Sequence, residues 1–201
     1  MRGGRKEGSY IILISKKIQD NDETCLELNN LFSTLIKEND ITDFLYRLGR
    51  KYLSNRSKYS EQKRFTKARI IFEISSKLGH SQSYLELASF YLDGYSVLKD
   101  LNKAKEYYEE SIKLGSSDGL VNLGILYLKG LGVKKDIPKA LKLFQESAKK
   151  ENTLALIYLG NFYLNGIYVN HDFDLAYNYY KQAADSGDSE GYIGLASLYM
   201  R

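Results

Sequence analysis

The sequence predicts an all-α fold, a right-handed α-solenoid built from stacked hairpins of a helix A and a helix B. The main observation is self-similarity with a period of about 36 residues, because segment 120–151 matches segments 84–115 and 156–187 in register. A fixed period of this length is the signature of helical repeat proteins. The chain also has one proline in 201 residues. Alanine, leucine, lysine and glutamate fall in periodic runs, which favours helices throughout.

The period divides the chain into a leading segment and a repeat array. We expect residues 1–38 to form an N-terminal tail and a leading helix, and residues 39–201 to form the array. Its predicted units are a degenerate repeat at 41–79, full repeats at 80–115, 116–151 and 152–187, and a partial repeat at 188–201. Three extra residues in the degenerate repeat fall between its two halves, where a loop accommodates them at little entropic cost.

Each repeat carries start and stop signals for two helices. In the second full repeat, helix A is predicted at about 118–129 and ends at Gly130, since glycine tolerates the left-handed conformation that follows many helices. Asp136 is placed to cap helix B, a contribution of about 1 kcal/mol. Pro138 falls in the first turn of that helix, where its missing N–H costs little. The aspartates one period before and after Asp136 repeat the cap signal.

Two glycines lie inside predicted A helices and require an explanation. Gly124 and Gly160 each cost about 1 kcal/mol of helix propensity relative to alanine. We therefore expect backbones that pack too closely there for a larger side chain. A tyrosine follows three residues later in every repeat and is expected in the core with its hydroxyl at a neighbouring turn. These tyrosines are Tyr52, Tyr91, Tyr127, Tyr163 and Tyr199.

The same residue types recur at the same repeat positions. In the third full repeat they are Ala155, Leu159-Gly160, Tyr163, Gly166, Asp172, Ala176, Tyr180, Ala183-Ala184 and Gly187. This pattern resembles the Sel-1-like repeat family, a relative of the tetratricopeptide solenoids, over roughly residues 41–201. Glu151 and Ile112 depart from it, where the family has glycine and alanine. The resemblance implies an adaptor that holds other proteins together.

The sequence contains no evident catalytic or metal-binding arrangement. Both histidines lie in predicted turns, and the repeated aspartates are explained as helix caps. Cys25, the only cysteine, cannot form an intrachain disulfide and is expected to be a small apolar residue on a helix. We expect a non-enzymatic protein with no cofactor and no metal. Because no apolar run has the length of a membrane span or a signal peptide, the expected location is the cytoplasm.

Three positions of helix A vary freely between repeats, whereas its core positions do not. Spacings of three and four residues place each trio on one face of its helix. Stacking would align these faces along the inner curve of the superhelix, the surface that such arrays use for binding, although an ordinary solvated face is the alternative. The predicted groove consists of Arg47, Arg50, Glu86, Ser89, Asp93, Asn122, Ile125, Lys129, Tyr158, Asn161 and Asn165.

The first repeat is strongly basic. Residues 45–78 contain ten Lys or Arg and two Glu, whereas the net charge of the whole chain is +4. Besides the groove arginines, the basic patch consists of Lys51, Arg56, Lys58, Lys63, Arg64, Lys67 and Arg69. Such a patch suits an acidic or phosphorylated protein segment, but it is also typical of a merely soluble helix surface. The main hypothesis is a scaffold that binds a protein segment in the groove. Nucleic-acid or anionic-surface binding through residues 45–78 is the alternative.

The last predicted helix A, at 188–201, carries several apolar residues and has no helix B after it in the sequence. Solenoids need terminal elements with a polar outer face to stay soluble. One possibility is that this helix turns its whole apolar surface inward. We instead expect an open apolar patch that mediates self-association or partner docking.

Overall fold

The computed structural model describes residues 41–57 and 59–200. Within these residues the chain is helical and contains no β-strand, which confirms the predicted all-α solenoid class. The predicted leading helix and Cys25 lie outside the described residues. The described helices are α3 (Ile41–Ser54), α4 (Glu61–Lys77), α5 (Ser81–Asp93), α6 (Leu101–Lys113), α7 (Ser117–Lys129), α8 (Ile137–Ala148), α9 (Thr153–Asn165), α10 (Phe173–Asp185) and α11 (Ser189–Tyr199).

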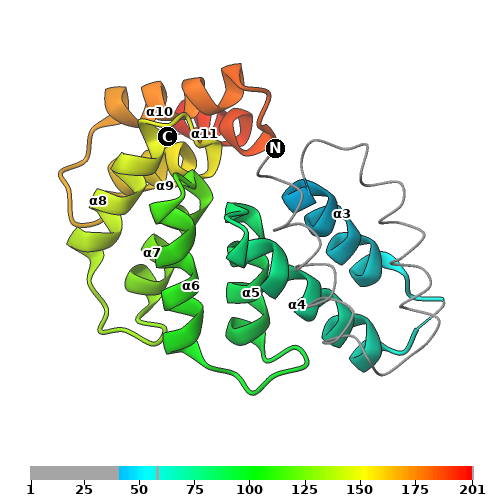
Figure 1. Cartoon of the computed structure of the whole chain (residues 1–201). Coiled ribbons are helices and arrows are strands. Elements are labelled where there is room, and N and C mark those ends of the chain that lie inside the picture. The colour runs from blue at the N-terminus through cyan, green and yellow to red at the C-terminus, as the bar shows by residue number, and fades with distance from the viewer. Residues whose placement is uncertain (1–40, 58, 201) are drawn as a thin grey trace, which may run out of the picture. The chain divides into compact units, whose positions relative to one another are not determined.

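The chain forms two compact units, one ending at Lys99 and the other beginning at Asp100. In the first unit, α4 packs against both α3 and α5 (Figure 1). In the second unit, each helix from α6 to α11 packs against the next, and α9 also packs against α11. The division falls between helix A and helix B of one predicted repeat, so the units do not coincide with whole repeats.

The predicted aspartate caps are present on three B helices. Asp100, Asp136 and Asp172 each accept a bond from the backbone N–H three residues later, at 2.8 to 3.0 Å. The N–H groups of Asp136 and Asp172 also donate to the carbonyls of Tyr127 and Tyr163, at 2.9 and 3.1 Å. All three aspartates therefore start a helix B, and Asp136 and Asp172 also tie the preceding loop to the end of helix A.

Helix ends in the repeats depend on left-handed backbone. Gly130 ends α7 with φ of 73° and donates its N–H to the Leu126 carbonyl, as predicted. Glu151 stands where the family pattern has glycine, and it keeps the left-handed conformation with φ of 58°. A side chain with a Cβ is disfavoured there, so the departure seen in the sequence is a point of local strain and leaves the turn intact.

The interior glycines of the A helices face an aromatic ring of helix B. A Cβ at Gly124 would lie 2.8 Å from the Phe144 ring, and a Cβ at Gly160 would lie 2.5 Å from the Tyr180 ring. Both rings are buried, with exposed fractions of 0% and 1%. The expected close approach is confirmed, but the neighbour is a buried aromatic side chain, whereas the sequence led us to expect a second backbone.

Buried serines close the hairpins at their other end. Ser75 of α4 donates its hydroxyl to the Thr42 carbonyl of α3 at 2.8 Å. Ser147 of α8 donates to the Ser117 carbonyl of α7 at 2.9 Å. Both serines have an exposed fraction of 0%, so the buried hydroxyl is satisfied by a carbonyl in the first turn of helix A, and its small side chain does not separate the helices.

The recurring tyrosines only partly follow the prediction. Tyr52, Tyr91 and Tyr127 are buried, Tyr163 is half-buried, and Tyr199 is 80% exposed. The expectation of a core position is therefore wrong for Tyr199, because no described helix packs over that side of α11. The hydroxyl of Tyr127 accepts a bond of 2.7 Å from the Lys139 ammonium group on α8, so its partner is a side chain within the same hairpin.

Gly124→Leu and Gly160→Leu are expected to lower the thermal melting temperature strongly, because the new side chain meets a buried ring. Overpacking of this kind costs about 1–3 kcal/mol of unfolding free energy or more. Ala196→Leu is the matched control, since Ala196 lies one period after Gly160 and is exposed. That variant and Asn122→Ala should change the unfolding free energy by less than about 0.5 kcal/mol. Equal changes of melting temperature in all four variants would show that Gly124 and Gly160 do not lie on the packed face of helix A.

Candidate functional site

In the first unit, groove residues of the two A helices contact each other. Arg50 of α3 and Glu86 of α5 form an ion pair with 2.7 Å between Nη1 and Oε1, and the Tyr46 hydroxyl donates to the same oxygen at 3.4 Å. The hydrogen bond to Glu86 and its negative charge raise the pKa of Arg50. Burial, followed by the charge of Glu86, raises the pKa of Tyr46. The predicted faces of α3 and α5 therefore meet at a cross-helix ion pair.

Other groove residues of this unit also interact within the protein. Arg47 pairs with Asp43 of the same helix at 2.9 Å, and Ser89 donates to the Leu85 carbonyl at 3.2 Å. Asp93 is exposed at the end of α5. The variable face of the first unit is thus a polar network that is largely satisfied within the unit itself.

In the second unit, two groove residues have structural partners that the sequence did not reveal. The Tyr158 ring of α9 stacks on Phe144 of α8, with 4.6 Å between centroids and 2° between planes. This half-buried position raises the pKa of Tyr158. Asn161 is exposed, and its Oδ1 accepts a bond of 2.8 Å from the hydroxyl of the buried Tyr180. Both side chains help to hold helix A against helix B.

The rest of this face is more accessible. Lys129 and Asn165 are exposed, and Asn122 and Ile125 are half-buried. Asn165 donates its Nδ2 to the Asn161 carbonyl at 2.9 Å. The α7 and α9 positions therefore present amide groups and a lysine around half-buried apolar side chains.

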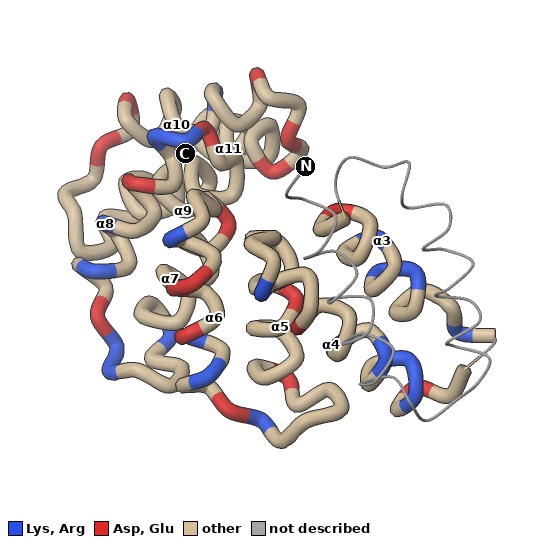
Figure 2. The backbone as a smooth tube through the Cα atoms, in the orientation of Figure 1, with Lys and Arg blue, Asp and Glu red and all other residues tan. Residues whose placement is uncertain are grey.

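Lys and Arg residues recur along α3 and α4 of the first unit (Figure 2), and two arginines of the basic patch, Arg64 and Arg69, have partners within that unit. Arg69 forms an ion pair with Glu73 one turn later on α4. Arg64 is only 8% exposed, and its Nη1 donates to the Leu53 carbonyl at the end of α3. Arg47, Arg50 and Arg69 thus have an acidic partner within the unit, whereas Arg64 bonds to a neutral carbonyl and keeps its charge uncompensated by that contact.

The lysines of the patch gather around two tyrosine rings. The Lys67 ammonium lies 4.6 Å from the Tyr59 ring centroid and 5.4 Å from that of Tyr52, and the Lys63 ammonium lies 5.6 Å from Tyr59. Such cation–π contacts are worth about 0.5–1 kcal/mol at exposed sites. Lys51 and Arg56 are exposed, and Lys58 lies outside the described residues. The exposed cations of residues 45–78 are thus spread over α3, α4 and the loop between them, and two lysines of α4 lie beside tyrosine rings.

The histidines have local structural roles. The His80 Nδ1 accepts the Ser83 N–H at 3.3 Å and so caps α5, and its ring stacks on Tyr46 at 4.8 Å between centroids. His171 Nδ1 lies 3.1 Å from the Leu164 carbonyl. Among residues 41–57 and 59–200, no three His, Cys, Asp or Glu side chains are arranged to hold a metal ion. In that same part of the chain, no helix has the combination of length and apolar character that a bilayer span requires.

Comparison with protein-family models finds four Sel1 repeats in the chain, at residues 42–80, 81–116, 117–152 and 153–188. The chain belongs to the Sel1 repeat family. The family assignment confirms both the resemblance seen in the sequence and the period of about 36 residues. Comparison with curated protein sequences finds no match.

Solved structures share this fold. A Sel1 repeat protein from Oxalobacter formigenes is 23% identical with a TM-score of 0.71, and the match covers 89% of this chain and 75% of that one. A protective antigen of uropathogenic Escherichia coli with an SLR fold is 25% identical with a TM-score of 0.67, over 79% of this chain but 33% of that one. An immunity protein from Pseudomonas aeruginosa is 26% identical with a TM-score of 0.60, over 79% and 58%.

The Arg50–Glu86 ion pair is expected to couple α3 to α5 energetically. A double-mutant cycle with Arg50→Gln and Glu86→Gln, measured by urea unfolding, should give a coupling near 1 kcal/mol, the upper end for solvent-accessible pairs. Arg50 is more than half exposed, which keeps the coupling from being larger. The Asp43–Arg47 pair within α3 is the control and should give about 0.3–0.5 kcal/mol. A coupling no larger than that of the control would contradict a cross-helix role.

Proposed function

We propose that this Sel1 repeat chain is a non-enzymatic scaffold that binds a segment of another protein along the variable face of its A helices. Sel1 repeat proteins generally mediate protein–protein interactions. The observation that carries the proposal is the face of the second unit, where Asn122, Ile125 and Lys129 of α7 and Asn161 and Asn165 of α9 reach the surface.

The chemistry of this face suits an extended peptide. Asparagine amides carry both donors and acceptors, which match the N–H and C=O groups of a peptide backbone. Asn161 uses its Oδ1 for Tyr180, which fixes the direction of its exposed amide group. Ile125 and Tyr158 are half-buried and offer apolar contact beside the amides. An ordered polar face with apolar contacts between its amides can recognise backbone and side chain together.

The shifted pKa values in the described residues have local structural causes. The groups with raised pKa values are Tyr46, Arg50, Tyr158, Tyr179 and Lys181. Burial is the leading cause for the three tyrosines, and hydrogen bonds to Glu86 and Asp185 are the leading causes for Arg50 and Lys181. Catalytic sites typically combine an acid and a base with shifted pKa values in one cleft. The five groups named here do not form such a pair.

Nucleic-acid or anionic-surface binding through residues 45–78 remains the second candidate. The lysine–tyrosine cluster around Tyr59 favours it, because lysines and aromatic rings together suit phosphates and bases. The internal pairing of Arg47, Arg50 and Arg69 argues against it, since fewer cations are left for phosphate contacts.

Affinity capture at two salt concentrations separates the two candidates. Protein partners bound to the immobilised chain should persist when NaCl rises from about 50 to 200 mM, whereas phosphate-led binding falls steeply over that range. The double variant Lys129→Glu/Asn165→Arg should lose most of the captured protein. Lys142→Glu/Asn178→Arg, exposed positions on α8 and α10, is the matched control. Equal loss in both double variants, or capture of nucleic acid that disappears with salt, would count against the scaffold proposal.

We also propose that the outer side of α11 associates with a second copy of the chain. Tyr192, Ile193, Tyr199 and Met200 are 56% to 81% exposed on this side. Leu195 and Leu198 instead pack against the cluster of Leu164, Ala176 and Tyr180. The helix therefore turns part of its apolar surface inward and leaves a distinct apolar strip outside, and Leu198 does not belong to that strip.

Light scattering at increasing protein concentration tests this association. The parent chain should show a mass that rises with concentration, because the exposed strip buries apolar area on contact. Ile193→Lys and Met200→Lys should remain monomeric and should keep the melting temperature of the parent chain. Leu198→Glu should lower the melting temperature, because Leu198 belongs to the packed cluster. A parent that stays strictly monomeric at high concentration would remove the support for this surface.

A further inference from the structure

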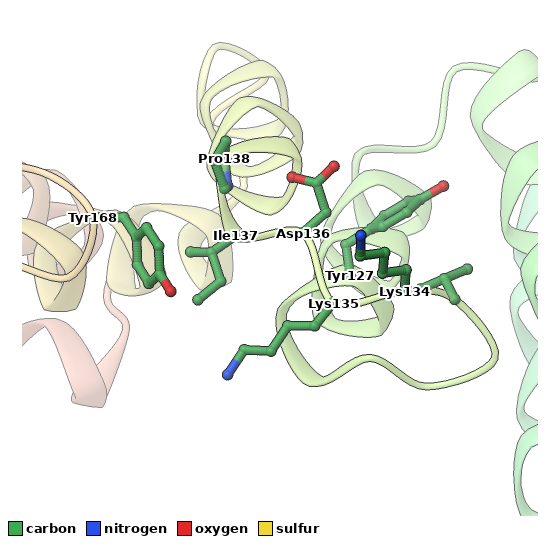
Figure 3. A pocket seen from close by; sticks show the side chains of 8 residues that line it. Tyr127, Lys134, Lys135, Asp136, Ile137, Pro138 and Tyr168 are labelled. Atoms are coloured by element: carbon green, nitrogen blue, oxygen red, sulfur yellow. The ribbon is translucent and has the colours of Figure 1, made fainter.

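A recess of about 640 Å³ opens between the α7–α8 loop and the α9–α10 loop of the second unit (Figure 3). None of its residues belongs to the predicted groove or to the basic patch. It lies at the loop end of the hairpins, where α8 begins. The recess is lined by Tyr127, Val133, Lys134, Lys135, Asp136, Ile137, Pro138 and Tyr168.

Tyr168 forms one wall of the recess and has an unusual backbone. Its φ is 57°, and Ser96 and Gly132, which occupy the same loop position in the two preceding repeats, have φ of 56° and 67°. Glycine adopts this left-handed conformation without cost, whereas a bulky aromatic residue is strained in it. Since Ser96 and Gly132 share this conformation, the loop itself imposes it, and Tyr168 places a large side chain at a position where glycine would be unstrained.

The same loop position packs differently in the preceding repeat. A Cβ at Gly132 would lie 2.5 Å from the Cβ of Leu101, so that loop has no room for a side chain beside α6. Ile137 lies one period after Leu101, and Tyr168 one period after Gly132. In this repeat a full aromatic ring is present, 69% exposed and facing Ile137 (Figure 3). The recess thus exists where the neighbouring repeat has a direct loop-to-helix contact.

The rim of the recess is positively charged. Lys134 and Lys135 are exposed, and Lys135 extends to the side of the recess where Tyr168 lies (Figure 3). The only lining carboxylate, that of Asp136, accepts the Lys139 backbone N–H at 2.9 Å as a helix cap. The Lys139 ammonium donates to the Tyr127 hydroxyl at 2.7 Å and lies 4.1 Å from its ring centroid. Apolar walls under a lysine-bearing rim therefore define the chemistry of the site.

We propose that this recess binds a protein segment in which an aromatic or large aliphatic side chain is flanked by carboxylates. The apolar side chain packs against the exposed Tyr168 ring and the exposed Pro138, above the buried Ile137, where it removes apolar area from water. The flanking carboxylates pair with Lys134 and Lys135, which selects acidic over basic segments. This site is separate from the A-helix face of the proposed scaffold function and does not require it.

The test uses the full ¹⁵N-labelled chain and three acetylated, amidated pentapeptides, EEFEE, EEAEE and KKFKK, in NMR titrations. EEFEE should cause saturable shifts at the amides of residues 133–137 and 167–169, and the other two peptides should not. Tyr168→Gly should weaken EEFEE binding by about tenfold or more, as expected for loss of an aromatic anchor. That variant should melt at the parent temperature or higher, because glycine relieves the left-handed strain.

Matched variants separate a binding role from a structural one. Lys135→Glu should weaken EEFEE binding by about tenfold and strengthen KKFKK binding, whereas Lys142→Glu on α8 and Tyr192→Ala on α11 should leave both unchanged. Lys129→Glu/Asn165→Arg should also bind EEFEE like the parent, so failure of the scaffold proposal and failure of this site are distinguishable. The proposal is overturned if EEFEE gives no saturable shift, shifts other regions, binds no better than KKFKK, or binds Tyr168→Gly equally well.

Discussion

The repeats depend on one packing interaction, in which an aromatic ring of helix B is buried against the backbone of helix A at a glycine. Phe144 lies against Gly124 of its own hairpin and stacks on Tyr158 of the next A helix. Tyr180 lies against Gly160 and Gly194 in the same manner, and Phe72 against Gly49. The ring therefore joins three helices at once, and the helix propensity lost at each glycine, about 1 kcal/mol, is offset by burying the aromatic group.

This arrangement divides helix A into a constant side and a variable side, although the division is less clean than a pattern of varying residues suggests. Asn161 and Tyr158 vary between repeats, yet one accepts a bond from Tyr180 and the other stacks on Phe144. Arg50 varies too, and it joins α3 to α5 through Glu86. The surface that we propose for partner binding is thus built partly from residues that also hold the repeats together. These internal contacts give the face a defined side-chain arrangement.

Local signals in the sequence predicted the features that repeat every 36 residues. The helix ends at Gly130, the aspartate caps and the close approach at Gly124 all depend on short-range patterns, and the structure confirms them. The partners of Asn161 and Arg50 were missed because they depend on the side chains present in one particular pair of helices. The recess beside Tyr168 left a signal that was overlooked, namely a tyrosine at the loop position that is Gly132 one period earlier. Binding through the basic residues 45–78 stays a prediction, and a count of cations could not show that Arg47, Arg50 and Arg69 pair with acidic side chains within the fold.

Native-state hydrogen exchange of the Phe144→Ala variant tests the central role of the buried ring most directly. Removing a fully buried Phe typically costs about 3–5 kcal/mol, and Phe144 has an exposed fraction of 0%. If the ring joins three helices, amide protection should fall together in α7, α8 and α9, because these helices lose a shared contact. A loss of protection confined to α8, with α7 and α9 unchanged, would contradict the account.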